Sequence, residues 1–223
     1  GFIRKALKDA GFANIPVISF NVVGMEKMPG FKITPDMVEK LLKVVVYGDL
    51  LQKMLTKNRV YEVNKGETQK LYDEWMQKCK ELVVHSSLSE FKKSIYDMVN
   101  DFEKIELDTS MKKPKVGIVG EVLIKYHPFG NNFIAEKLEQ EGAEVILPDF
   151  MGFVKFMATH KITFNTLIKT DKYKAKIFKL AIKLIDILEK DERIALANSK
   201  KGYLQPCDIW ELEDKVKDIL SIG

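Results

Sequence analysis

The sequence is poor in cysteine and histidine, and both scarcities narrow what the chain can do. Its two cysteines, Cys79 and Cys207, are too few for a disulfide framework, so we expect a reducing, cytoplasmic setting. Neither has a second cysteine nearby, so we expect no iron–sulfur ligation by this chain. His85 and His160 stand alone, without a second histidine or a carboxylate at metal-ligand spacing. The sequence therefore predicts no metal site.

Strong charge of either sign and long apolar runs are also missing. The chain has 36 basic against 32 acidic residues and a net charge of +4, too balanced for the concentrated basic face that nucleic-acid binding needs. No apolar run approaches the roughly 20 residues that span a bilayer, and the first residues have no signal-peptide pattern. We expect neither nucleic acid nor a membrane as partner.

The glycine motifs of nucleotide-binding loops are missing too. Gly117 and Gly120 resemble such a loop only superficially, because neither G-x-G-x-x-G nor G-x-x-x-x-G-K-[ST] is present. These glycines are better explained by tight turns. We expect no ATP, dinucleotide or other cofactor to bind within this chain.

What is present is a strand–loop–helix–strand pattern over residues 115–149, the βαβ unit of an open parallel sheet. Val116, Ile118 and Val119 predict a strand buried on both faces. A helix ends at Gly142, and residues 144–147 resume as the second strand. Ligands of open α/β sheets bind beyond the carboxyl ends of strands, so the loop at residues 120–132 is the first candidate site.

That loop holds the densest set of polar and ionisable residues at a predicted strand end. The candidate ligand-facing or cavity-facing residues are Gly120, Glu121, Tyr126, His127, Asn131 and Asn132. Each has a plainer alternative: Asn131 or Asn132 can cap the next helix, and the pair His127–Pro128 can simply shape the loop. A second loop, at residues 21–31, is a further candidate wall of the site.

Three helices are expected between the first and second sheet segments. The first begins at Pro35 after a Thr34 cap, and the third has a bundle seam at Phe91, Ile95, Met98 and Phe102. The segment preceding them, residues 16–20, reads as β and is a candidate neighbour of the strand at 115–119. The third helix thus closes a helical insertion between sheet strands.

The C-terminal part also reads as helical. One helix is expected to bury an apolar face made of Tyr173, Ile177, Leu180, Ala181, Leu184 and Leu188. Its other side is lysine-rich, at positions 169, 172, 174, 176, 179 and 183; a solvated face explains this better than phosphate binding does. A last helix begins near Ile209.

These patterns predict an α/β fold: an incomplete, Rossmann-like parallel sheet with a large inserted helical region. We divide the chain into a first α/β segment (1–33), the helical insertion (34–110), the βαβ unit (111–150) and a helical C-terminal part (151–223). Together they are expected to form one compact domain cut from a longer protein.

A family resemblance covers essentially the whole chain. The segment KVGIVGEVLIKYHPFGNNFIAEKLEQEGAEVILPDF, residues 115–150, resembles part of the large proteins related to activators of 2-hydroxyacyl-CoA dehydratases, the CoA-substrate-specific enzyme activase group. Residues 1–55 resemble the segment that those proteins have just after a cysteine-containing turn. Residues 209–223, IWELEDKVKDILSIG, resemble the helix before their Gly-Glu-Gly-Trp stretch.

The resemblance implies a parent protein that couples ATP hydrolysis and electron transfer through a 4Fe–4S cluster to dehydration of CoA thioesters in anaerobic metabolism. Cluster ligands and the ATPase domain would lie outside this chain, whose partners would be the rest of the parent chain and a CoA thioester. The loop at 120–132 would then face the acyl-CoA or cluster cavity, and this chain alone should be catalytically silent. Whether the parent is activator, dehydratase or both stays open.

Two other functions remain open on the sequence. One is a small-molecule binding lobe that presents the loop at 120–132 without a redox role. The other is a protein interaction module in which the helices of residues 34–107 dock a partner or a second copy. The sequence does not fix the oligomeric state or the acyl group.

Overall fold

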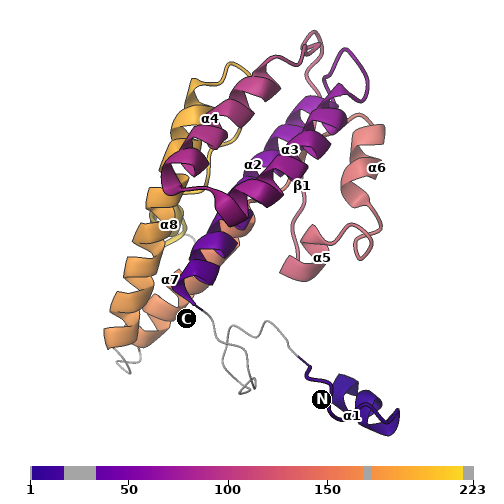
Figure 1. The fold of residues 1–223 in the computed structure, drawn as a ribbon. Coiled ribbons are helices and arrows are strands. Elements are labelled where there is room, and N and C mark those ends of the chain that lie inside the picture. Colours follow the sequence, from indigo (N-terminus) through magenta and orange to yellow (C-terminus); the bar gives the residue numbers. More distant parts are fainter. Residues whose placement is uncertain (1, 18–33, 168–171, 218–223) are drawn as a thin grey trace. The chain divides into compact units, whose positions relative to one another are not determined.

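The computed structural model describes residues 2–17, 34–167 and 172–217, shown as coloured ribbon in Figure 1. The chain divides into two compact units, Gly1–Glu39 and Lys40–Gly223. In the first, helix α1 spans Phe2–Asp9, and Gly11 closes it with a positive φ of 85°. The predicted β segment at 16–20 falls mostly, and the loop at 21–31 wholly, outside the described residues.

Three helices follow along the chain, as the sequence predicts. They are α2 (Pro35–Arg59), α3 (Glu67–His85) and α4 (Leu88–Glu103). Helix α2 begins at Pro35 with the Thr34 hydroxyl accepting the N–H of Met37, and Ser87 and Glu90 form a capping box on α4. Local capping chemistry therefore fixes where these helices begin.

The main hydrophobic core lies between these helices and the C-terminal ones. The α4 seam is fully buried: Phe91, Ile95, Met98 and Phe102 are each 0% exposed. They pack with Leu50 and Met54 of α2 and with Trp75 and Cys79 of α3 in a single cluster. Tyr47 of α2 adds a hydrogen bond to Ser94 of α4, because the two hydroxyl groups lie 2.6 Å apart.

The βαβ unit is present, and its sheet is small. Strands β1 (Lys115–Gly117) and β2 (Glu144–Ile146) pair in parallel, with Val116 opposite Val145. Short helices α5 (Val122–Tyr126) and α6 (Ile134–Gln140) connect them on one side of the unit (Figure 1), and Gly142 turns the chain with φ 88°. The parallel pairing predicted from the sequence is confirmed.

The expected burial of the first strand is wrong. Of the three residues on which it rested, Val119 is 85% exposed, and Val116 and Ile118 are only half-buried. The apolar run predicted a strand covered on both faces, whereas within the described residues β1 has only β2 as a neighbouring strand.

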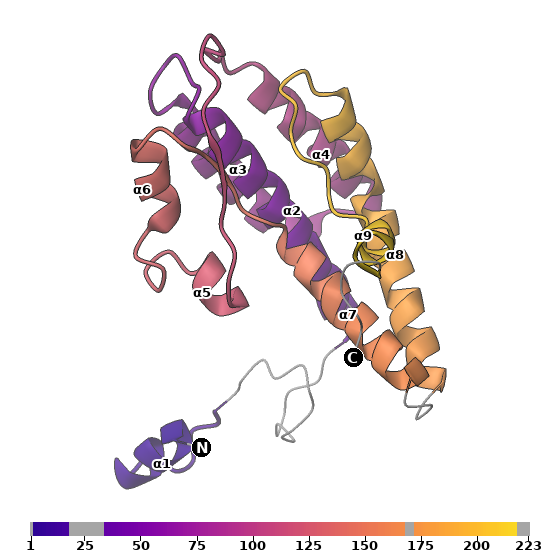
Figure 2. The ribbon, with the colours of Figure 1, turned by 180° about the vertical axis from the view of Figure 1, so that it is seen from behind.

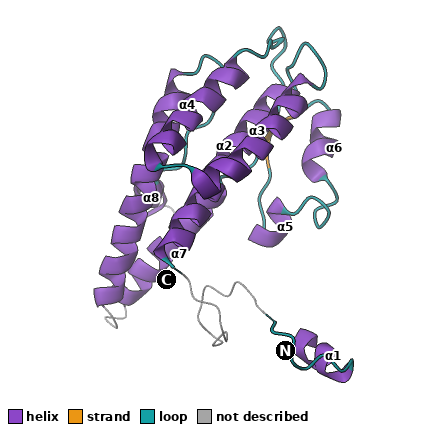
Figure 3. Cartoon of the chain, in the orientation of Figure 1, coloured by secondary structure: helices purple, strands orange, loops and turns teal. Residues whose placement is uncertain are grey.

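The C-terminal helices are α7 (Phe150–Leu167), α8 (Lys172–Asn198) and α9 (Ile209–Lys217). Helix α8 packs on α7 and α4, and α9 packs on α7; α4 and α8 run side by side in both Figure 1 and Figure 2. Figure 3 shows how far helix outweighs strand. The described part of the chain is thus mostly helical with one two-stranded parallel sheet, an α/β arrangement with a large helical region.

The predicted burial of the apolar face of α8 is wrong. Ile177, Leu180 and Leu184, assigned to the core, are 49%, 58% and 51% exposed, and Tyr173 is 74% exposed. The buried face holds instead Ala175, Ile182, Ile185, Glu189, Glu192 and Leu196. The helix is rotated relative to the prediction because its interior face is partly charged.

No helix within the described residues combines the length and the apolar character required to cross a membrane.

Candidate functional site

A cleft lies beyond the carboxyl ends of β1 and β2, and we call it the strand-end cleft. It has two adjoining chambers, of about 240 Å³ and about 300 Å³, which share four lining residues: Gln52, Tyr72, Tyr126 and Leu147. Helices α2 and α3 form one wall, and the segments that follow β1 and β2 form the other. This is the edge of the sheet at which parallel α/β folds hold their ligands.

Tyr126 joins the two strand-end segments. Its hydroxyl donates a 2.5 Å hydrogen bond to the carbonyl of Pro148, and its ring packs edge-on against Phe150 with centroids 5.4 Å apart. Burial, with the carboxylates of Asp49 and Asp149, raises the Tyr126 pKa, so the phenol remains a proton donor at neutral pH. Tyr126 therefore fixes the shape of both chambers.

Asp49 is one of the titratable groups that line the larger chamber. Its two carboxylate oxygens each accept a 2.8 Å hydrogen bond, from the N–H groups of Phe150 and Met151 at the start of α7. Burial raises the pKa of Asp49 from 3.8 to about 7, and the neighbouring Asp149 adds to the rise, although the two N–H groups and Lys53 oppose it. Asp49 therefore exchanges a proton near neutral pH beside the cleft.

Two of the cations that line the smaller chamber are held in place. Lys125 lies over the Tyr126 ring at 4.6 Å, and Arg59 is paired with Glu139 at 2.7 Å while donating to the side chain of Gln69. By contrast, the side chains of Gln52 and Tyr72 have no hydrogen-bond partner within the described residues. An amide and a phenol that line both chambers are thus available to a ligand.

The six predicted site residues do not all lie at the cleft. Tyr126 and Asn131 line the cleft, whereas Gly120, Glu121, His127 and Asn132 are exposed and are not among the residues that line its two chambers.

Local hydrogen bonds account for most of these loop residues. The Glu121 carboxylate caps α5 by accepting the N–H of Ile124, and His127 Nδ1 accepts the N–H of Gly130. Asn131 donates to the carbonyls of Ile124 and Lys125 and accepts the N–H of Ile134, so it both shapes the loop and caps α6. These contacts match the plainer alternatives weighed for His127 and Asn131.

Behind the cleft lies a buried ion network that ties α2, α7 and α8 together. Lys53 bridges Asp149 at 3.2 Å and Glu192 at 3.1 Å, and burial raises the Glu192 pKa to about 8. Deeper in, the fully buried Lys155 ammonium lies 2.7 Å from Glu189, which Arg193 also contacts at 2.9 Å.

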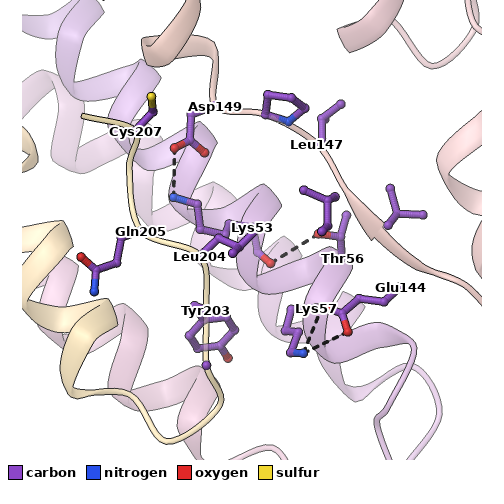
Figure 4. A pocket seen from close by; sticks show the side chains of 14 residues that line it. Lys53, Thr56, Lys57, Glu144, Leu147, Asp149, Tyr203, Leu204, Gln205 and Cys207 are labelled. Carbon is purple, nitrogen blue, oxygen red and sulfur yellow. Dashed lines mark hydrogen bonds and ion pairs between the residues drawn. The ribbon is translucent and has the colours of Figure 1, made fainter. Parts of the chain in front are cut away.

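A further cavity of about 160 Å³ opens onto this network (Figure 4). The figure shows Lys53 reaching Asp149 and Lys57 reaching Glu144 along its wall, with the segment of Tyr203 to Cys207 on the other side. Its charged groups are already paired, so it is better explained as the surface of a structural network than as a ligand site.

Burial makes both cysteine thiols harder to ionise. Cys79 is buried, and burial raises its pKa to about 12. Burial also raises the pKa of Cys207. Within the described residues no three His, Cys, Asp or Glu side chains are grouped to hold a metal ion.

Sequence reasoning missed Asp49, Gln52, Tyr72 and the ion network. A usable signal existed for one of them: Asp49 interrupts the apolar run that surrounds it in α2. A charge at a position that helical periodicity assigns to the interior is a candidate buried polar group.

Comparisons with protein families, with characterised proteins and with solved structures gave no match for this chain.

Proposed function

We infer that this chain is a ligand-binding lobe, Rossmann-like in topology, of a cytoplasmic protein related to activators of 2-hydroxyacyl-CoA dehydratases. The strand-end cleft would hold part of a CoA thioester and would do no chemistry alone. A 4Fe–4S cluster and ATP would act elsewhere in the parent protein, which would dehydrate the thioester.

One observation favours binding above all. Gln52 and Tyr72 line both chambers, and neither has a hydrogen-bond partner within the described residues. An amide and a phenol can donate to and accept from the amide groups that run along the pantetheine arm of CoA. Lys125, which also lines the smaller chamber, offers a positive charge to a phosphate.

The experiment is isothermal titration calorimetry with acetyl-CoA on the wild type and on Gly48→Leu. Gly48 lines the larger chamber, and a Cβ at this position would meet no atom within 4 Å. The leucine side chain should therefore occupy the chamber without a clash and abolish the binding heat. Removing a glycine from the interior of α2 should meanwhile raise the free energy of unfolding by about 0.5–1 kcal/mol.

Gly48→Ala is the matched control. It gives the same helix stabilisation with one carbon in the chamber, so acetyl-CoA should still bind. No binding heat with wild-type protein, or equal binding by wild type and Gly48→Leu, would contradict the cleft as the site. Turnover of acyl-CoA or ATP by the purified chain would contradict the absence of chemistry.

A further inference from the structure

The exposed side of α8 carries an apolar stripe with regular spacing. Ile177, Leu180, Leu184 and Ile187 follow one another at intervals of three, four and three residues, and each is 49–58% exposed. That spacing is the a/d seam of a coiled coil. We call these four residues the α8 seam.

The α8 seam lies opposite the face that α8 buries. Ala175, Ile182, Glu189 and Leu196, spaced seven residues apart, are all buried. On a helix with 100° per residue, Ile182 is about 160° from both Leu180 and Leu184. The seam is therefore a second face of α8, opposite the face that packs into the core.

The seam ends where α4 packs against α8. The next seam position is Asp191, which accepts a hydrogen bond from Tyr96 at 3.0 Å and lies 3.6 Å from Lys92. The uncovered stretch is therefore close to two heptads, enough for a short helix to lie along it.

A column of lysines follows one flank of the seam. Lys176, Lys183 and Lys190 are seven residues apart, all exposed, and none has an acidic partner within the part of the chain that the structure describes. At this flanking position of a coiled coil, a partner's glutamates would pair with them. A second copy would instead bring like charges together if the two helices were antiparallel.

We propose that the α8 seam is the docking surface for an acidic amphipathic helix of a partner protein. Regular a/d spacing matches a helix ridge, and the lysine column selects a ridge flanked by carboxylates. A lipid surface would also accept leucines flanked by lysines, so the vesicle measurement below separates it from a partner helix.

The test uses two designed helical peptides of about 28 residues, long enough to be helical, with leucine at a and d. One has a column of glutamates beside the leucines, and the other has lysines there. Fluorescence anisotropy should show the glutamate peptide binding the full chain about tenfold more tightly, as three exposed ion pairs would provide.

Three variants make the result specific to α8. The change Lys176→Glu with Lys183→Glu and Lys190→Glu should reverse the preference between the peptides. Leu180→Glu with Leu184→Glu should abolish binding by both. The control, Leu41→Glu with Val44→Glu, alters two similarly exposed apolar residues of α2 and should leave binding unchanged; circular dichroism checks the helix content of every variant.

Several outcomes would overturn the proposal. These are binding of neither peptide, equal binding of both, or binding that survives the Leu180 and Leu184 changes. Sedimentation that shows a concentration-dependent dimer, lost in the same double variant, would assign the seam to a second copy. Co-sedimentation with phosphatidylserine vesicles in place of peptide binding would assign it to a lipid surface. None of these outcomes depends on whether the strand-end cleft binds acetyl-CoA.

Discussion

Helices α4 and α8 have similar apolar periodicity and opposite relations to the core. In α4 the periodic apolar residues are the interior, and Phe91 and Ile95 are fully buried. In α8 the more regular apolar stripe is outside, while Glu189 and Glu192 are inside with 1% exposure each. Periodicity therefore locates a helix and its faces, but which face is buried depends on the residues that each face contacts.

The partners that bury the charged face of α8 come from distant parts of the chain. Lys53 of α2 reaches Glu192, and Lys155 of α7 reaches Glu189. Paired and hydrogen-bonded charges can occupy an interior that unpaired charges cannot. Because paired charges occupy the buried face of α8, its regular apolar stripe lies on the exposed face.

The largest expected effect separates the two apolar stripes. Phe91→Ala should lower the free energy of unfolding by about 3–5 kcal/mol, because it opens a cavity in the main core. Leu180→Ala removes a side chain that is 58% exposed and should cost no more than about 0.5 kcal/mol. Urea denaturation measures both, and a similar loss for the two would mean that α8 buries its apolar stripe after all.

A substitution in the ion network should lower the free energy of unfolding nearly as much as one in the core. Lys155→Met keeps most of the side-chain volume but takes the positive charge from beside Glu189, and we expect a loss of about 3 kcal/mol. Adding Glu189→Leu removes the carboxylate that has lost its nearer cation and should recover more than half of that loss. A double variant less stable than Lys155→Met, in the same denaturation assay, would refute a buried pair.

A smaller effect should appear as pH dependence. The pKa of Asp49 is raised to about 7 in the folded state, so its contribution to stability is complete below about pH 4 and is lost as the pH rises to 7. The loss can reach about 1.4 kcal/mol per pH unit.

Asp49→Asn removes this titration, so the stability of the variant should fall less steeply than that of the wild type between pH 4 and 7. Denaturation at several pH values checks the slope, with the exposed Asp97→Asn as control. A slope in Asp49→Asn equal to that of the wild type would show that Asp49 titrates normally.

Local signals predicted much of this structure. Thr34–Pro35 fixed the start of α2, the α4 seam identified the core, and the βαβ pattern located a parallel pair and the edge where the cleft opens. The details that decide the cleft were not predictable locally. Asp49 and Gln52 lie in a helix more than 60 residues before the loop at 120–132, and only tertiary packing brings them to Tyr126.

The loop at residues 120–132 shows a second limit of prediction from sequence. Six residues were candidates because polar groups concentrate there, yet Glu121 and His127 are engaged by backbone groups three residues away. Sequence composition indicates where polar groups gather, whereas hydrogen bonding determines which of them remain available.

Hydrogen–deuterium exchange with and without acetyl-CoA tests the strand-end cleft most directly. Binding should slow exchange in the segments that follow β1 and β2, residues 118–131 and 147–150, because a ligand in the cleft would hold both. Unchanged exchange in these segments, or protection confined to residues 202–207 beside the other cavity, would contradict it.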